Sequence, residues 1–484
     1  MQPIESNPLG DHPNRSVDLR VEGKELVERL AEWLEQSMVN NGHPTAEKVL
    51  DYQDEQSVYS DWKQIPPGQL TALELFQRVI KQSIRLHHPG FLGHQISPAA
   101  PVAALSGLVS DLLNNGMGVY EMGMAGTAIE RVVVEMVADL LDFGPQASGV
   151  LTSGGSLGNL TALLTARNVK LPETIQQGTH AIRPAVMVSQ QAHYCVQRAV
   201  AIMGWGTDGV VPVPVNDKFQ MDTTQLANCL EQATDQGRQV IAVVGSASST
   251  ATGSYDDLNR IGRFCQQHDL WFHVDGAHGA AAAFSEKYRH LIAGIEHADS
   301  VVLDFHKLLL TPALATALVF RNGKDGYRTF AQKAEYLFSD DERDSQWHNI
   351  ALRSFECTKL MMSLKVFSIY AIHGFRAWDD NVTSLFDMAR QFAALVQQSD
   401  DLQLLVEPET NIVCYRFTAG PKDRLNEINQ TIRDRLLREG NFYIVQTNLD
   451  GVHWLRSTVG SCTTTVETVK SLLQQVVTTG KSFT

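Results

Sequence analysis

The chain has 484 residues, of which 43% are hydrophobic and 19% are charged. This is an ordinary globular composition, and the length suits either two or more domains or one large α/β domain with a smaller appendage. The formal net charge of −14 argues against nucleic acid or an anionic membrane surface as a partner.

The cysteines and the N-terminus narrow the setting of the protein. The six cysteines are scattered and form no CxxC pair, so the sequence predicts neither a zinc site nor a disulfide framework. The N-terminus is polar and lacks the apolar core of a signal peptide. No run of about 18 apolar residues is available to span a bilayer. We therefore expect a cytoplasmic protein with no metal and no membrane partner.

Two amphipathic helices are expected near the start of the chain. Apolar residues recur at helical spacing from Val21 to about Met38, and again from Leu70 to about Leu86. An amphipathic helix needs a surface that covers its apolar face. The segment from His88 to Gly93 follows, and its proline and glycines by themselves indicate a turn.

A glycine-rich turn follows the short apolar run from Val150 to Thr152. The residues Ser153-Gly154-Gly155-Ser156 lead into a helical stretch from Leu160 to Asn168. Glycines let backbone N–H groups approach an anion closely, and the N-terminus of a helix adds a partial positive charge. The turn is therefore a candidate phosphate site, although a glycine-rich turn alone is more often a plain loop.

Four more apolar runs predict buried parallel strands. They are Pro184 to Ser189, Val240 to Val244, Leu270 to Phe272 and Val301 to Leu303. Asp275 follows the third run and Lys307 follows the fourth. Because ligands bind at the carboxyl ends of the strands in an open α/β sheet, Asp275 and Lys307 are expected to share a site.

A lysine and a carboxylate at such a site are the minimum equipment for pyridoxal phosphate (PLP) chemistry. The lysine amine forms a Schiff base, and the carboxylate keeps the pyridinium nitrogen protonated so that the ring accepts electrons. We predict these roles for Lys307 and Asp275, and we expect burial and the imine link to lower the effective pKa of Lys307. Taken alone, such residues are more often a solvated lysine and a helix-capping aspartate.

The segments from His273 to Gly279 and from Ala298 to Lys307 resemble the group II PLP-dependent decarboxylases, which include the aromatic amino acid, glutamate, cysteine sulfinate and 2,4-diaminobutyrate decarboxylases. The resemblance extends from about His88 to the C-terminal region. It implies an α/β protein with the type I fold of PLP-dependent transferases, whose large domain holds a mostly parallel seven-stranded sheet. It also implies a homodimer with its active site at the subunit interface.

The resemblance implies three parts of the chain. Residues 1–87 form an N-terminal helical dimerisation segment, residues 88–377 a large PLP-binding domain, and residues 378–484 a small α+β domain. The sequence after Trp378 agrees with this division, because helical stretches alternate there with short strand-like runs such as Ile412 to Phe417.

Matching motifs imply roles at the cofactor. Gly155 and Ser156 match contacts to the PLP phosphate, and His306 matches a residue that helps to bind it. His193 matches a histidine that stacks on the pyridine ring. Ala277 matches the small residue that packs against the opposite face of the ring.

Two further matches concern the edges of the site. Thr250 matches a threonine expected on the 3′ side of the cofactor, but Ser248 and Ser249 stand where the family usually has Gly-Thr. The segment from His88 to Gly93 resembles a motif of the substrate pocket. We therefore place Phe91, with His94 next to the motif, in that pocket.

The region between Gly326 and Ser354 departs from the family. In the resembled enzymes a mobile loop here carries a tyrosine that protonates the quinonoid carbanion after carbon dioxide leaves. In this chain the segment from Ser339 to His348 is acidic and polar, which fits a lid, but it contains no tyrosine. Tyr336, His348 or a residue of the other subunit could serve instead. Thr358-Lys359-Leu360 also stands where the family often has Thr-Arg-Arg.

The sequence thus predicts a PLP-dependent carboxy-lyase that converts an L-amino acid to the amine and carbon dioxide. The reaction would pass through a Schiff base on Lys307 and a quinonoid intermediate, with His193 and Asp275 as the other catalytic residues. If no acid protonates the quinonoid, aldehyde formation, aminotransfer or lyase chemistry would follow instead. A non-catalytic scaffold would have lost Lys307 or Asp275, and both are present. The substrate stays open, with a lean toward a small or basic amino acid such as 2,4-diaminobutyrate.

Overall fold

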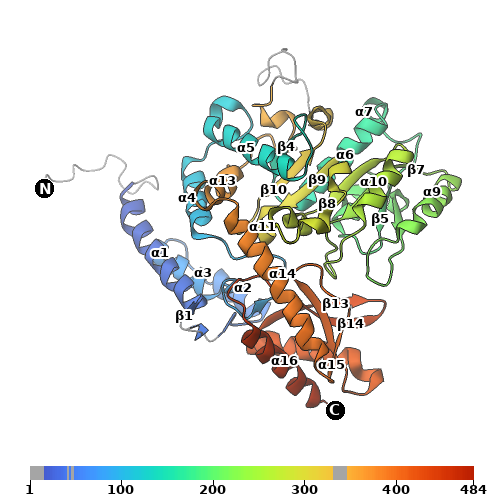
Figure 1. The fold of residues 1–484 in the computed structure, drawn as a ribbon. Helices are drawn as coiled ribbons and strands as arrows, with labels where there is room; N and C mark the ends of the chain where they lie inside the picture. The colour runs from blue at the N-terminus through green and yellow to red at the C-terminus, as the bar shows by residue number, and fades with distance from the viewer. Residues whose placement is uncertain (1–15, 41–42, 45–47, 331–345, 484) are drawn as a thin grey trace, which may run out of the picture.

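The computed structural model describes residues 16–40, 43–44, 48–330 and 346–483. Within these residues, one sheet of seven strands and one of five organise the fold, and a long helix, α14, runs from the first to the second (Figure 1). The expected α/β class is confirmed, with a mostly parallel seven-stranded sheet and a helical N-terminal region.

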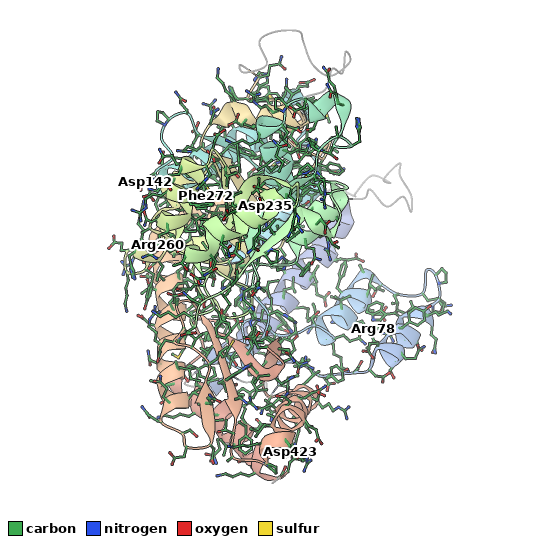
Figure 2. The ribbon with its side chains drawn as sticks, turned by 90° about the vertical axis from the view of Figure 1, so that its right-hand side faces the viewer. Arg78, Asp142, Asp235, Arg260, Phe272 and Asp423 are labelled. Atoms are coloured by element: carbon green, nitrogen blue, oxygen red, sulfur yellow. The ribbon has the colours of Figure 1, made fainter. Side chains whose placement is uncertain are left out.

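The N-terminal helices form an arm that projects from the body (Figures 1 and 2). They are α1 (Ser16–Ser37), α2 (Glu55–Lys63) and α3 (Ala72–Lys81), with the short antiparallel pair β1 (Val39–Asn40) and β2 (His43–Pro44) after α1. A capping box starts α3, because the Thr71 side chain accepts a hydrogen bond from the backbone N–H of Glu74 at 3.2 Å and the Glu74 carboxylate accepts one from Thr71 at 2.8 Å. Phe76 and Val79 of α3 stay exposed.

The large sheet has the strand order β4-β10-β9-β8-β7-β5-β6. Its strands are β4 (Ser148–Thr152), β5 (Pro184–Ser189), β6 (Val210–Val213), β7 (Gln239–Ser246), β8 (Trp271–Asp275), β9 (Ser300–Asp304) and β10 (Thr316–Phe320). Strands β9, β8, β7, β5 and β6 are parallel, whereas β10 runs antiparallel to both β9 and β4. Ser246 pairs with Asp275, and Asp275 with Val302, so the carboxyl ends of β7, β8 and β9 lie together.

Helices cover both faces of this sheet, which explains why its strands are apolar throughout. In β7, Val243 joins the core that contains residues of α5 (Met124–Leu140), α9 (Leu226–Asp235) and α10 (Leu258–Gln267). Its neighbour Val244 joins the core formed with α6 (Gly155–Lys170) and α8 (Cys195–Ile202). Successive side chains of a strand point to opposite faces, so both layers are built from one apolar run.

The smaller sheet has the order β11-β12-β14-β13-β3. It consists of β3 (Phe91–Leu92), β11 (Leu402–Leu404), β12 (Ile412–Phe417), β13 (Tyr443–Leu449) and β14 (Val452–Thr458), covered by α14 (Arg376–Gln397), α15 (Leu425–Glu439) and α16 (Val466–Lys481). β3 pairs in parallel with β13, with Phe91 opposite Tyr443. This strand therefore extends the C-terminal sheet, although the sequence places residue 88 at the start of the large domain.

Shorter elements complete the fold. They are α4 (Pro101–Leu113), α7 (Thr174–Gln177), α11 (Phe305–Leu308), α12 (Tyr327–Phe330) and α13 (Met362–His373). The start of α14 is anchored on α11, because Trp378 donates its indole N–H to the carbonyl of Leu309 at 3.0 Å and Asn381 donates to that of Leu308 at 2.9 Å. Among the helices described here, none is long and apolar enough to cross a bilayer.

Candidate active site

A cavity of about 300 Å³ lies at the carboxyl ends of the central strands. All eight residues that the sequence assigns to the cofactor line it: Gly155, Ser156, His193, Thr250, Asp275, Ala277, His306 and Lys307. These residues converge because they lie on five different loops, all of which leave the sheet at the edge formed by the carboxyl ends of its parallel strands. Asp304, His278 and Cys195 also line the cavity, and the sequence assigned them no role at the cofactor.

The glycine-rich turn presents the N-terminus of α6 to this cavity. Gly154 precedes the helix with φ at +113°, a conformation that favours glycine, and no side chain described in the structure caps the helix. A Cβ on Gly155 would lie 3.2 Å from the Cβ of Ala277 and 3.2 Å from Asp304 Oδ1. The turn therefore approaches the opposite wall closely and offers uncapped N–H groups, which fits a phosphate.

Lys307 lies against a buried carboxylate that the sequence reading missed. Its Nζ is 3.1 Å from Oδ2 of Asp304, and Thr316 donates its hydroxyl to Oδ1 of the same carboxylate. Burial lowers the pKa of Lys307, but Asp304 and then Asp275 raise it, and the result is a raised pKa. Burial alone therefore does not give the free lysine the lowered pKa that the sequence predicts, and the further effect of the imine link stays a prediction. The signal was in the sequence, because Asp304 precedes Lys307 by one helical turn.

Asp275 is held at the end of β8 by two donors. The backbone N–H of Ala277 donates to Oδ1 at 3.2 Å, and the thiol of Cys195 contacts Oδ2 at 3.8 Å. Both donors point at the carboxylate and fix its orientation at the strand end. An ionised carboxylate at this position is the group that a protonated ring nitrogen requires.

His193 stands on the loop between β5 and α8. Its Nδ1 accepts a hydrogen bond from the backbone N–H of Cys195 at 3.2 Å, and its ring lies 4.1 Å from that of Tyr194. Burial lowers the pKa of His193, and the charge of Asp275 opposes this change only in part. The imidazole is therefore neutral near pH 7 and can lie flat against an aromatic ring.

The loop that carries Thr250 is braced by the C-terminal domain. Arg456 of β14 donates to the carbonyl oxygens of Thr250 at 2.8 Å and Ala251 at 3.1 Å. Only 5% of Arg456 is exposed, and no carboxylate of the described residues lies within ion-pair distance of it. A buried cation thus stands behind one wall of the cavity.

The two residues expected in the substrate pocket lie outside the residues that line this cavity. Phe91 is buried and stacks on Tyr443, with ring centres 5.7 Å apart, and the exposed His94 lies 5.9 Å from the same tyrosine. Their role at the substrate stays a prediction. Of the two proton donors considered, Tyr336 lies outside the described residues, and the ring of His348 meets that of Tyr120 edge-on at 5.6 Å.

The site therefore offers an anion-binding turn, an amine, a carboxylate and a flat imidazole around one cavity. A family model described as "Pyridoxal-dependent decarboxylase conserved domain" matches residues 59–418. The chain belongs to this family. The resemblance that the motifs indicated is confirmed, PLP is the cofactor, and the reaction is the decarboxylation of an amino acid.

Individual relatives of this pyridoxal-dependent decarboxylase agree. The chain is 31% identical over 370 residues to an L-aspartate decarboxylase of Metarhizium robertsii, covering 76% of this chain and 74% of that protein. It is 29% identical over 421 residues to an L-2,4-diaminobutyrate decarboxylase of Acinetobacter baumannii, covering 84% and 82%. The crystal structure of Oryza sativa TDC with PLP and tryptamine shares the fold, with a TM-score of 0.88, 20% identity and coverage of 97% and 99%.

Proposed function

We propose that Lys307 binds PLP covalently and that Asp275 pairs with its ring nitrogen. PLP supplies, when bound, an electron sink for the bond pair that departing carbon dioxide leaves behind. The proposal is supported by the positions of the two residues: Asp275 ends β8, Lys307 lies in the short helix that follows the neighbouring strand β9, and both line one cavity. His193 and Ala277, also in its lining, would hold the two faces of the ring.

The phosphate and the 3′ side of PLP have separate candidates. We propose the uncapped N–H groups of Gly155 and Ser156 for the phosphate, together with the imidazole of His306. Thr250 would face the 3′ side, on the loop that Arg456 braces from behind. This arrangement uses the helix N-terminus for the anion and leaves Lys307 free for the aldehyde.

Arg456 is the observation that carries our substrate proposal. A buried guanidinium without a carboxylate partner is costly, and an anionic ligand offsets that cost. Partial burial of its ring and then the charge of Arg456 lower the pKa of His94, so this cation influences the expected substrate pocket. We therefore propose that the enzyme decarboxylates a short acidic L-amino acid, as the name of the Metarhizium robertsii relative also suggests.

A second candidate substrate, 2,4-diaminobutyrate, is the one toward which the sequence leaned. Glu356 stands beside the cavity and accepts a hydrogen bond from Ser153 at 2.8 Å. Its carboxylate could pair with the side-chain ammonium of a diamino acid. The Acinetobacter baumannii relative bears the name of such an enzyme. We rank this candidate second because Glu356 already has a partner, whereas none of the described carboxylates pairs with Arg456.

We further propose that the enzyme is a cytoplasmic homodimer with its active site at the subunit interface. The outer face of α4 exposes a group of large apolar side chains: Leu105, Leu108, Val109, Leu112 and Leu113. Leu314 lines the cavity and is itself 47% exposed, so the cavity opens beside another uncovered apolar side chain. The projecting arm of α1 to α3 would pack on the partner.

Phe91 would support His94 through Tyr443 at the outer end of the substrate pocket.

A product screen tests the proposed substrate. The purified enzyme with PLP is given L-aspartate, L-cysteine sulfinate, L-glutamate or L-2,4-diaminobutyrate, and carbon dioxide, amine, aldehyde and peroxide are measured. We expect amine and carbon dioxide in equal amounts from a short acidic substrate. Turnover of 2,4-diaminobutyrate alone would replace the acidic proposal by the second candidate. Aldehyde with peroxide would show that the chemistry is diverted.

Variants of Arg456 sharpen this test. Arg456→Gln should raise the KM for the acidic substrate by about 10- to 100-fold, since a hydrogen bond to a charged group contributes roughly 1.5–3 kcal/mol. Arg456→Lys should keep part of the affinity. Arg438→Gln, at an exposed position in the last turn of α15, is the control and should leave KM unchanged. An unchanged KM in Arg456→Gln would contradict the assignment of this residue.

A further inference from the structure

A continuous line of buried polar side chains lies behind Asp275. It begins in β8 and β9, where the indole Nε1 of Trp271 donates to the hydroxyl of Ser300 at 2.9 Å and that hydroxyl lies 2.8 Å from Nδ1 of His273. Phe272, labelled in Figure 2, is the residue of β8 between Trp271 and His273 and is itself buried. All three polar members of this first part are buried.

The line continues through α6 to α8. Nε2 of His273 is 2.7 Å from Oδ1 of Asn159, and Nδ2 of Asn159 donates to Sγ of Cys195 at 3.3 Å. Cys195 in turn contacts Oδ2 of Asp275 at 3.8 Å. Asn159 is 1% exposed and Cys195 3% exposed, and both border the cavity. Four elements, β8, β9, α6 and α8, thus meet at one carboxylate.

The amide oxygen of Asn159 can only accept, and this sets the tautomer of the neutral imidazole of His273. Its Nδ1, which also lies 3.1 Å from the carbonyl oxygen of Ser300, then accepts from the Ser300 hydroxyl, and that hydroxyl accepts from the indole N–H of Trp271. Nε2 of His273 then carries the hydrogen and donates to Asn159. At the far end a carboxylate can only accept, so Cys195 donates its S–H to Asp275. The donors run without a break from Trp271 to Asp275.

We propose that these residues form a positioning network for Asp275, in which the thiol of Cys195 makes the last contact and sets how much negative charge the carboxylate presents to the ring of PLP. The proposal rests on the role of Asp275 in the proposed function. It gives Asn159, Cys195 and His273 an indirect role, because they act through Asp275 and not on the substrate itself.

Two properties of the buried groups suit this purpose. Burial, and after it the charge of Asp275, raises the pKa of Cys195, so the residue stays a thiol and keeps its proton to donate. Burial lowers the pKa of His273 to about 4, so its imidazole is neutral near pH 7. The network therefore orients Asp275 without bringing a second cation to it, and a weak S–H donor leaves most of the negative charge for the ring nitrogen.

The visible absorbance band of PLP bound to Lys307 reports this charge. Removing the donor in Cys195→Ala leaves more negative charge on Asp275, which favours the protonated form of the nearby cofactor–lysine link. We expect the pH midpoint of the band to rise by about half a unit, a roughly threefold change in proton affinity. Cys195→Ser retains an O–H donor and should shift the midpoint less. Ser300→Ala breaks the network at a distance and should also raise the midpoint.

Cys265→Ala is the matched control. Cys265 is 2% exposed and lies in α10, outside the residues that line the cavity, so its replacement loses the same buried sulfur without touching Asp275. The pH midpoint of the absorbance band in Cys265→Ala should equal that of the unaltered enzyme. Thermal unfolding of each variant without PLP measures the structural cost separately.

The outcomes are distinct. A midpoint in Cys195→Ala and Ser300→Ala equal to that in Cys265→Ala would overturn the network while leaving the proposed function intact. An unaltered enzyme that forms no band with PLP would overturn the assignment of Lys307, and the inference would fall with it. If Cys195→Ala does not fold, the comparison of Cys195→Ser with Ser300→Ala decides, because both keep the volume of the core close to the original.

Discussion

A buried ion pair seals the edge of the sheet next to the cofactor turn. β4 ends the large sheet, and its last residues lead into the turn at Gly154. Nζ of Lys359 lies 2.6 Å from Oε1 of Glu130 and donates to the carbonyl of Leu151, while the N–H of Leu151 donates to the same Oε1 at 3.0 Å. The pair therefore satisfies both backbone groups that Leu151 leaves unpaired at this edge.

Replacing Lys359 by Met should destabilise the protein strongly. The side chains of Lys359 and Glu130 are 2% and 4% exposed, so Glu130 would remain as a buried charge without its partner. Breaking a buried pair in this way costs about 3–5 kcal/mol. For a cooperative unit of about 290 residues, the length expected of the large domain, that corresponds to a fall in the thermal midpoint of roughly 5–8 °C, which differential scanning calorimetry measures.

The double variant and a surface pair separate charge from packing. Glu130→Gln together with Lys359→Met removes both charges and keeps an acceptor for Leu151. The double variant should therefore recover most of the thermal midpoint that Lys359→Met loses. Arg376→Gln breaks an exposed pair with Asp380, where the side chains are 88% and 68% exposed, and should cost less than about 1 kcal/mol. A fall in Lys359→Met no larger than in Arg376→Gln would refute this reasoning.

Two more predictions follow from the cavity. Gly155→Ala should weaken PLP binding by about 5- to 150-fold in equilibrium dialysis, because overpacking costs roughly 1–3 kcal/mol and the new Cβ would lie 3.2 Å from that of Ala277. Gly107→Ala, with an ordinary contact of 3.4 Å, should leave PLP binding unchanged. Acid should also destabilise the fold. Burial, and after it Lys307, lowers the pKa of His278 to about 3, so the unfolded chain binds its proton first and stability falls as the pH drops from about 6.5 toward 3. His278→Gln should flatten this dependence of the unfolding free energy on pH, as measured by circular dichroism. His373→Gln, at an exposed position, is the control. A pH dependence in His278→Gln as steep as in this control would contradict the prediction.

The cofactor residues could be predicted because each stands directly after a strand or in a short motif. The apolar runs locate the strand ends, and the carboxyl ends of parallel strands meet at one edge. Lys307, Asp275 and Gly155 therefore share a cavity without any knowledge of long-range contacts. The predicted strand from Pro184 to Ser189 coincides with β5, for the same reason.

What the sequence could not supply depends on packing between distant segments. Phe91 sits in a strand that pairs with residues 352 positions later, a register that no local pattern contains. The line from Trp271 to Cys195 needs the relative placement of four elements. The raised pKa of Lys307 likewise depends on how deeply Asp304 is buried beside it, since exposure would have screened that charge.

The covalent attachment of PLP is the most direct test of the account. The enzyme is incubated with PLP, reduced with sodium borohydride, digested, and mapped by mass spectrometry. We expect a phosphopyridoxyl group on the peptide that contains Lys307. In Lys307→Ala, we expect neither this label nor the visible absorbance band. A label on another lysine, or an unlabelled enzyme, would contradict it.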